Sequence, residues 1–229
     1  MQIHHNQSTN FLAEAIRKEA QQLSLTLPED VIPELAAYAK SLWSWNVRLN
    51  LTRHTDVQQF VQRDVIDTAA ICPFMKTNER VLDVGTGGGV PGVVLAILRR
   101  DLTVELSDTS SKRIAALRSI LDEIKLSLTI HHQPAQQIAH DMNSQGHPFD
   151  TLIIRAVAPL PKLLAWFEPI SNVYGRLLLI KGPRWEAEKR DSRHRGFLKK
   201  VTARRIADWP IPGKDTQSVL LEIKKRHNA

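Results

Sequence analysis

Cysteine is nearly absent from this chain. Cys72 is the only cysteine among 229 residues, so an internal disulfide is impossible and a zinc site built on cysteines is excluded. A single thiol is typical of proteins that work in a reducing compartment, and we therefore expect a cytoplasmic location.

Long apolar runs are also missing. No uninterrupted run approaches the roughly 18 residues that a membrane span needs. The first ten residues are polar and lack the charged and then apolar pattern of a secretion signal. We therefore expect no membrane association.

Acidic residues are fewer than basic ones, 24 against 31, which gives a formal charge of +7. The excess is concentrated between Arg184 and Arg205, where nine lysines and arginines face three acids. Two interpretations of this segment stay open: a solvated surface loop, or a patch that contacts nucleic-acid phosphates. On the second interpretation the RNA-binding residues would be Arg184, Arg193, Arg195, Lys199 and Lys200.

Helical periodicity dominates the first 75 residues. It predicts one helix over 10–24 with Asn10 as a possible N-cap, and a second that starts near Pro28. A third is expected over 55–72, capped by Thr55 or Asp56. We divide the chain into a helical extension, 1–75, and a second part, 76–229, which together form one compact unit.

From residue 76 on, short apolar runs alternate with helical patterns, as in a doubly wound parallel sheet. The segment 209–215 has the proline and glycine content of a turn. Strands are expected at 80–84, 102–108, 127–131, 149–154, 174–180 and 217–224. Helices are expected at 91–100, 111–124, 135–142 and 159–170.

Alternating glycines follow the first expected strand, in the stretch RVLDVGTGGGVPG. Gly85, Gly87 and Gly89 allow a tight turn without side chains, so a ligand can lie against bare backbone at a helix N-terminus.

Two ligand classes fit these glycines. Gly87, Gly89 and Gly92 satisfy the dinucleotide pattern G-x-G-x-x-G, which leaves an NAD-type oxidoreductase as one alternative. The other frame, an acid followed by alternating glycines, starts at Asp83 and is the pattern of S-adenosylmethionine methyltransferases. Both frames use Asp108, which ends the next strand and could accept hydrogen bonds from two ribose hydroxyls.

Five strings in order separate the two classes. The strings are WNVRLNLT (45–52), DVGTGGGVPG (83–92), DTSSKR (108–113), RAVAPL (155–160) and IKG (180–182). With them, over roughly residues 35–225, the chain resembles the bacterial small-subunit ribosomal RNA guanine-N7 methyltransferases, the RsmG or GidB family.

The resemblance implies a class I S-adenosylmethionine-dependent methyltransferase: a Rossmann-like, doubly wound, mostly parallel seven-stranded sheet with a helical N-terminal extension. It also implies methylation of guanine N7 in the 530 loop of 16S rRNA, with S-adenosylmethionine as cofactor. The partner would be 16S rRNA, the small ribosomal subunit or an assembly intermediate. We expect the chain to act as a monomer.

Site residues follow from the same resemblance. The cofactor-binding residues would be Asp83, Gly85, Thr86, Gly87, Gly89, Asp108, Ala135, Gln136 and Arg155. Arg155 would face the methyl group or the RNA, and Lys181 would meet RNA phosphate or the guanine. These two are the expected catalytic residues, and the segment from Arg184 to Arg205 should lie on the edge where the substrate enters.

The chain departs from the family pattern at three places. Asp64 follows Arg63 where the family usually has histidine, Pro134-Ala135-Gln136 replaces Arg-Ala-Glu, and Gln217 or a neighbour replaces an arginine. A divergent member, a different target guanine, or a catalytically silent RNA-binding relative are all compatible with these changes.

An N7 acceptor needs little acid–base chemistry. Guanine N7 carries a lone pair and no proton, so no general base is required. Cys72 precedes the first strand and is badly placed for the nucleophilic attack that methylation of a pyrimidine carbon uses. We expect no metal.

Overall fold

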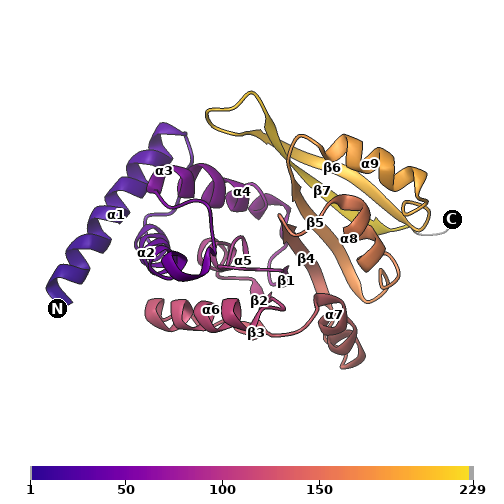
Figure 1. Ribbon diagram of the computed structural model, residues 1–229, viewed down its shortest axis with the longest axis horizontal. Coiled ribbons are helices and arrows are strands. Elements are labelled where there is room, and N and C mark those ends of the chain that lie inside the picture. Colours follow the sequence, from indigo (N-terminus) through magenta and orange to yellow (C-terminus); the bar gives the residue numbers. More distant parts are fainter. Residues whose placement is uncertain (1, 227–229) are drawn as a thin grey trace.

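The computed structural model describes residues 2–226 and begins with a helical region (Figure 1). This region bears out the helical character predicted for the first 75 residues. Its elements are α1 (Gln2–Gln22), α2 (Ile32–Leu49), α3 (Val57–Gln59), the π-helix η1 (Phe60–Val65), α4 (Ile66–Ala69) and the 3₁₀ turn η2 (Cys72–Phe74).

The helix boundaries differ from the expected ones. Asn10 lies inside α1, so its assignment as N-cap is wrong; the backbone before it stays helical, and no cap is needed there. α2 begins at Ile32 rather than near Pro28. Asp56 is confirmed as the cap of α3, because its side chain accepts a hydrogen bond from the Gln59 N–H at 2.7 Å.

Within the described residues, seven strands form one sheet in the order β3-β2-β1-β4-β5-β7-β6. β1 to β5 are parallel, and β7 runs antiparallel to both of its neighbours. The dinucleotide-binding order 3-2-1-4-5-6 has no such inserted strand. The strands are β1 (Arg80–Val84), β2 (Thr103–Ser107), β3 (Thr129–His131), β4 (Phe149–Arg155), β5 (Tyr174–Lys181), β6 (Val201–Pro210) and β7 (Gln217–Lys225).

Helices cover both faces of this sheet, because successive strand side chains point to opposite faces. Val81, Ile153 and Leu178 belong to an apolar core that also contains side chains of α1, α2, α5 and α6. Their chain neighbours Leu82 and Ile154 belong to a second core with α7 and α8. The helices are α5 (Gly92–Leu98), α6 (Ser111–Ile124), α7 (Ala135–Ser144), α8 (Leu160–Phe167) and α9 (Trp185–His194).

The basic segment between Arg184 and Arg205 is not a loop. Residues 185–194 form α9, and residues 201–210 form the edge strand β6, which the periodicity did not predict. Trp209 and Pro210, expected in a turn, therefore end a strand. β6 lies at the edge of the sheet and carries charged residues along its length, so it lacks the apolar run of a central strand.

A buried carboxylate supports the glycine loop from below. Asp83 is 1% exposed, and its Oδ2 accepts hydrogen bonds from Thr86 Oγ1 at 2.6 Å and from the Gly92 N–H at 2.9 Å. Among residues 2–226, Asp83 Oδ1 has no hydrogen-bond partner. Burial raises the pKa of Asp83 to about 6, although the bonds from Thr86 and Gly92 oppose this.

The shape of the glycine loop is restricted by a steric contact at Gly92 and by a hydrogen bond at Gly88. A Cβ on Gly92 would lie 2.4 Å from the Leu106 side chain and 2.6 Å from Asp83 Oδ2, so glycine is required there. On the other side, the Tyr38 hydroxyl of α2 donates to the buried carbonyl of Gly88 at 2.9 Å. The helical extension therefore helps to fix the shape of the loop.

Asp83→Asn should remove a pH-dependent loss of stability. The folded pKa of Asp83, about 6, lies above the unfolded value of about 3.9, so the folded state binds more protons between these values. The wild-type free energy of unfolding should therefore fall between about pH 4 and pH 6, by at most about 3 kcal/mol from this group, and stay lower above pH 6. Asparagine mimics the protonated carboxyl, so the free energy of unfolding of the variant should change less with pH between about pH 4 and pH 6. Urea unfolding of both proteins across this range measures the difference, and parallel curves would contradict the assignment.

Candidate active site

The glycine loop presents bare backbone at the carboxyl end of β1. Gly87 has a φ of +58°, a conformation that favours glycine, and a Cβ there would meet no atom closer than 4.0 Å. Gly89 has a φ of +110°, and a Cβ there would lie 2.6 Å from Val93. Glycine is thus needed for backbone conformation at Gly87 and also for packing at Gly89.

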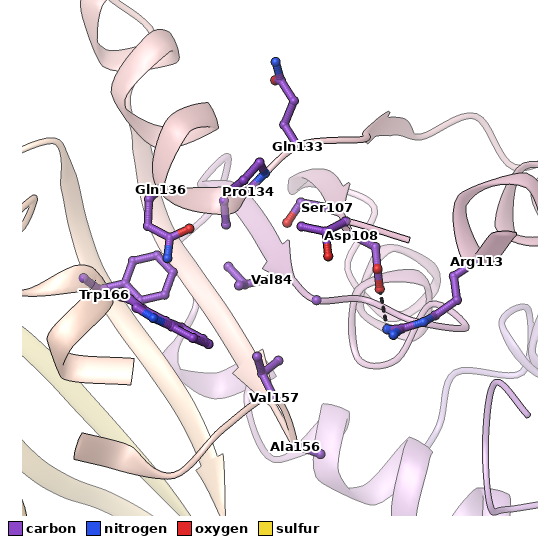
Figure 2. A pocket seen from close by; sticks show the side chains of 14 residues that line it. Val84, Ser107, Asp108, Arg113, Gln133, Pro134, Gln136, Ala156, Val157 and Trp166 are labelled. Atoms are coloured by element: carbon purple, nitrogen blue, oxygen red, sulfur yellow. Dashed lines mark hydrogen bonds and ion pairs between the residues drawn. The ribbon is translucent and has the colours of Figure 1, made fainter. Parts of the chain in front are cut away.

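Beside the loop, a cavity of about 510 Å³ opens at the ends of β1, β2 and β4. Figure 2 shows Asp108 and Arg113 on one side of it and Gln136 and Trp166 on the other. Ala135 and Pro134, at the start of α7, also line it, as do the apolar side chains of Val84 and Val157. The cavity has a size typical of ligand sites and combines an apolar wall with a few polar groups.

Asp108 is the central polar residue of this first cavity. It is 4% exposed, and its carboxylate accepts hydrogen bonds from the N–H groups of Gly87 at 3.1 Å and Ser110 at 2.8 Å. Arg113 Nη1 lies 2.9 Å from Oδ2, and the Arg113 side chain is about half exposed. The backbone contacts hold the carboxylate in place, while the contact with Arg113 comes from a half-exposed side chain.

A second cavity of about 490 Å³ lies on the other side of the glycine loop. It is lined by residues 85–88 of the loop and by residues 50–54, which connect α2 to α3. It shares Gly85, Arg113 and Ala156 with the first cavity. The two cavities therefore adjoin across the loop.

A third cavity of about 340 Å³ continues along the sheet edge to the end of β5. It contains Lys181 and Arg184 and shares His54, Arg155 and Ala156 with the second cavity. The three cavities lie in a row along the carboxyl ends of β1, β2, β4 and β5, where open α/β sheets bind ligands, and we call this row of adjoining cavities the cleft.

Arg155 stands between the second and third cavities and is held by two buried acids. Its guanidinium pairs with Asp64 through Nη2 and with Asp67 Oδ2 through Nη1 at 3.4 Å, and it also donates to the carbonyl of Arg63 at 3.2 Å. Asp64 is fully buried and Asp67 is 2% exposed. The π-helix η1 carries Arg63 and Asp64, and such widened turns are frequent at functional sites.

The same acids bind further side chains. His54 Nδ1 lies 2.8 Å from Asp64 Oδ1, and Trp209 Nε1 of β6 donates to Asp67 Oδ1 at 2.9 Å. Burial raises the pKa of Asp67, although Arg155 opposes the shift. Asp64, one of the departures from the family pattern, is therefore a member of a connected charged cluster.

Lys181 is also paired. Its Nζ lies 2.7 Å from Glu188 Oε2 of α9 and donates to the carbonyl of Ala158 at 3.1 Å. Its side chain is 12% exposed. Lys181 therefore reaches the third cavity as one half of an ion pair.

The basic segment lies only partly at the cleft. Of its expected RNA-binding residues, Arg184 lines the third cavity, whereas Arg193 and Lys199 line a separate groove. Arg195 pairs with Asp191 at 2.9 Å, and Lys200 pairs with Glu168 at 3.4 Å. The segment is thus divided between two places, because α9 leads the chain away from the cleft, and its role in RNA binding stays a prediction.

The structure brings most of the expected cofactor residues together. The first and second cavities are lined by Gly85, Thr86, Gly87, Asp108, Ala135, Gln136 and Arg155. Asp83 lies beneath the loop, so any effect on a ligand would act through Thr86 and Gly92. Gln217 only begins β7, paired with Pro210.

Some lining residues were not expected. Arg113 lies within the string DTSSKR, and its place next to Asp108 could have been predicted, because Asp108 comes just before α6 and Arg113 lies in the first turn of that helix. His54 and Trp166 have no local signal, because each reaches the cleft only through tertiary packing.

Solved structures support the fold. An O-methyltransferase from Bacillus cereus in complex with SAH superposes with a TM-score of 0.57 at 17% identity, covering 82% of this chain and 90% of that one. At this identity the likeness concerns the fold alone. Together with the sheet order, it shows the class I methyltransferase fold with a helical N-terminal region.

Sequence relatives identify the family. A ribosomal RNA small subunit methyltransferase G from Rhodopirellula baltica is 38% identical over 83% of this chain and 80% of its own length. One of the same description from Chlorobium chlorochromatii is 31% identical over 86% of this chain and 84% of its own. The family model GidB, rRNA small subunit methyltransferase G, matches residues 31–210. The chain therefore belongs to the GidB family of small-subunit rRNA methyltransferases.

Proposed function

We propose that the chain transfers the methyl group of S-adenosylmethionine to N7 of a guanine in the 530 loop of 16S rRNA. The observation that carries this proposal is the row of adjoining cavities from Asp108 to Lys181 in a chain of the GidB family. One end of the cleft is suited to a nucleoside, and the other end carries cationic side chains. The inserted antiparallel β7 and the family match argue against the NAD-type alternative.

The residues of the first and second cavities fit the cofactor. Asp108 would accept the two ribose hydroxyls, with Arg113 displaced toward solvent. Val84, Val157 and Gln136 offer an apolar wall and an amide to the adenine ring. The bare backbone at Gly87 leaves room for the rest of the molecule. When bound, S-adenosylmethionine supplies an electrophilic methyl group on a sulfonium.

The chain's own residues would act by positioning. The bonds from Asp64 and Asp67 fix the orientation of Arg155, and Glu188 fixes that of Lys181. Fixed donors can hold the guanine and its phosphates in line for attack, which is the main contribution an enzyme makes to a displacement of this kind. Neither residue has to move a proton, because N7 has none to lose.

The acceptor would be presented by 16S rRNA, by the small ribosomal subunit or by an assembly intermediate, with the enzyme acting as a monomer in the cytoplasm. Arg184 lines the third cavity with Lys181 and would be the cation of the basic segment that meets RNA at the cleft.

The direct test is methylation of small-subunit rRNA by the purified protein. Labelled S-adenosylmethionine and rRNA that lacks the modification should give 7-methylguanine in the 530 loop, mapped by mass spectrometry. A labelled methyl group at another position would show that a different nucleotide is the target. Binding of both ligands without any label would favour the catalytically silent RNA-binding alternative.

Asp108→Asn should weaken cofactor binding. The variant loses one acceptor oxygen and the negative charge, which corresponds to about 1.5–3 kcal/mol for bonds to a charged group, or roughly 10- to 150-fold in Kd. Calorimetric titration with S-adenosylmethionine measures the change. Asp122→Asn, on the exposed side of α6, makes the same change of side chain away from the cavity and is the matched control. Equal affinities of the Asp108 variant and the wild type would remove Asp108 from the cofactor site.

The methyl-transfer step should show no basic limb near neutral pH. Because N7 loses no proton, the single-turnover rate should stay level between about pH 6.5 and pH 8, above the pKa of about 6 that burial gives Asp83. Rapid-quench measurements with saturating cofactor and RNA test this. A rate that rises tenfold per pH unit would point to an acceptor that must be deprotonated.

A further inference from the structure

A groove on the far side of α9 is lined by basic residues. Its cavity measures about 560 Å³, and no acidic residue lines it. We call it the distal basic groove. Its charged residues are Lys189, Arg193, Lys199, Arg204 and Arg226, and its other lining residues are Gly196, Leu198, Thr202 and Ala203.

The groove cations differ from their neighbours in the same segment. Within residues 2–226, none of the five forms an ion pair with an acid, whereas Arg195 and Lys200, which do not line the groove, are paired with Asp191 and Glu168. A groove of clustered cations without counter-charges attracts anions, because the like charges raise the local potential.

Ordered backbone builds the groove. α9 ends at His194, and Gly196, with a φ of +80°, turns the chain toward β6. The Arg226 N–H donates to the carbonyl of Lys200 at 2.8 Å, and its Nε donates to the carbonyl of Val201 at 3.1 Å. These bonds join the end of β7 to the start of β6, so the cations stand on a fixed framework.

The groove lies apart from the active-site cleft. Arg184, the N-cap of α9, and Glu188 line the third cavity, whereas Lys189 and Arg193 line the groove, and the two cavities share no residue. Glu188 and Lys189 are consecutive, so the two sites lie on different sides of the helix as well as toward its opposite ends. From Arg184 to Arg193, nine residues of helix correspond to roughly 14 Å, and phosphates of one nucleic-acid strand are spaced about 3.4 Å along a helix axis. An RNA that contacts both Arg184 and Arg193 must extend several nucleotides beyond the acceptor guanine.

We propose that the distal basic groove binds phosphates of the same RNA whose guanine enters the cleft. This rests on the proposed function and adds that the substrate is an extended RNA held at two separated places. Arginine and lysine side chains are the usual phosphate ligands, and the groove offers both types without a competing acid.

Two variants with equal charge change test the proposal. Arg193→Gln with Lys199→Gln removes two groove cations, and Arg195→Gln with Lys200→Gln removes two paired cations of the same exposed segment. Binding is measured at several salt concentrations with two RNAs. One is a long fragment of small-subunit rRNA, and the other is a hairpin of the target loop whose stem is too short to span roughly 14 Å.

The groove variant should lose affinity for the long RNA, and its slope of log affinity against log salt should flatten by about 1.4–1.8, the value for two lost phosphate contacts. Its affinity for the short hairpin and for S-adenosylmethionine should match the wild type. The control variant should keep the wild-type slope. Thermal melting of both variants checks that they are folded.

Three results would overturn the proposal: an unchanged slope in the groove variant, an equal loss in both variants, or an equal loss with the short hairpin. The first outcome would leave the groove to a partner other than RNA. Failure of the proposed function can be distinguished from these results. In that case the wild-type protein would bind RNA and cofactor but transfer no methyl group.

Discussion

The fold depends on one constraint: the glycine loop must keep its backbone bare and still hold a single shape. A loop without side chains cannot brace itself, so the support comes from other elements. Asp83 binds both ends of the loop from below, and the Tyr38 hydroxyl binds Gly88 from α2. Because α2 packs in the same apolar core as β1 and α5, the helical extension is part of this support. The division of the chain at residue 75 stays a prediction, and this shared core argues for one folding unit.

A second constraint concerns charge in the cleft. A cationic cofactor would be repelled by an isolated guanidinium, yet Arg155 stands beside the glycine loop. Asp64 and Asp67 neutralise it and at the same time fix its direction. Buried pairs of this kind add little to stability, since desolvation offsets their attraction, but they can specify one arrangement. The Asp64 departure from the family pattern is compatible with this view, because a carboxylate there pairs with both Arg155 and His54.

Much of the parallel sheet was predictable, because buried strands and amphipathic helices leave strong periodic signals. The glycine loop and Asp108 were predictable for a different reason: their roles depend on local backbone and on the ends of adjacent parallel strands. The partners of Arg155 were not predictable. Asp64 and Asp67 lie 91 and 88 residues away from it, and Trp209, which binds Asp67, lies 54 residues away. Only tertiary packing brings η1, α4 and β6 together with the end of β4. The pairing of Lys181 with Glu188 was hidden because α9 was not recognised as a helix.

The same physical effect explains why α9 escaped prediction and why its cations gather at one end. Its sequence, WEAEKRDSRH, has almost no apolar face, so hydrophobic periodicity gives no signal. Charge order adds to the packing that α9 gains from α8 and from Trp185 in the second core. Glu186 and Glu188 stand in the first turn and Arg193 and His194 in the last, each sign where the helix dipole favours it. This order puts acids beside the cleft, where Glu188 pairs with Lys181, and puts cations at the opposite end, where Arg193 joins the groove. Helix stability and the separation of charge between the two sites therefore follow from one arrangement of residues.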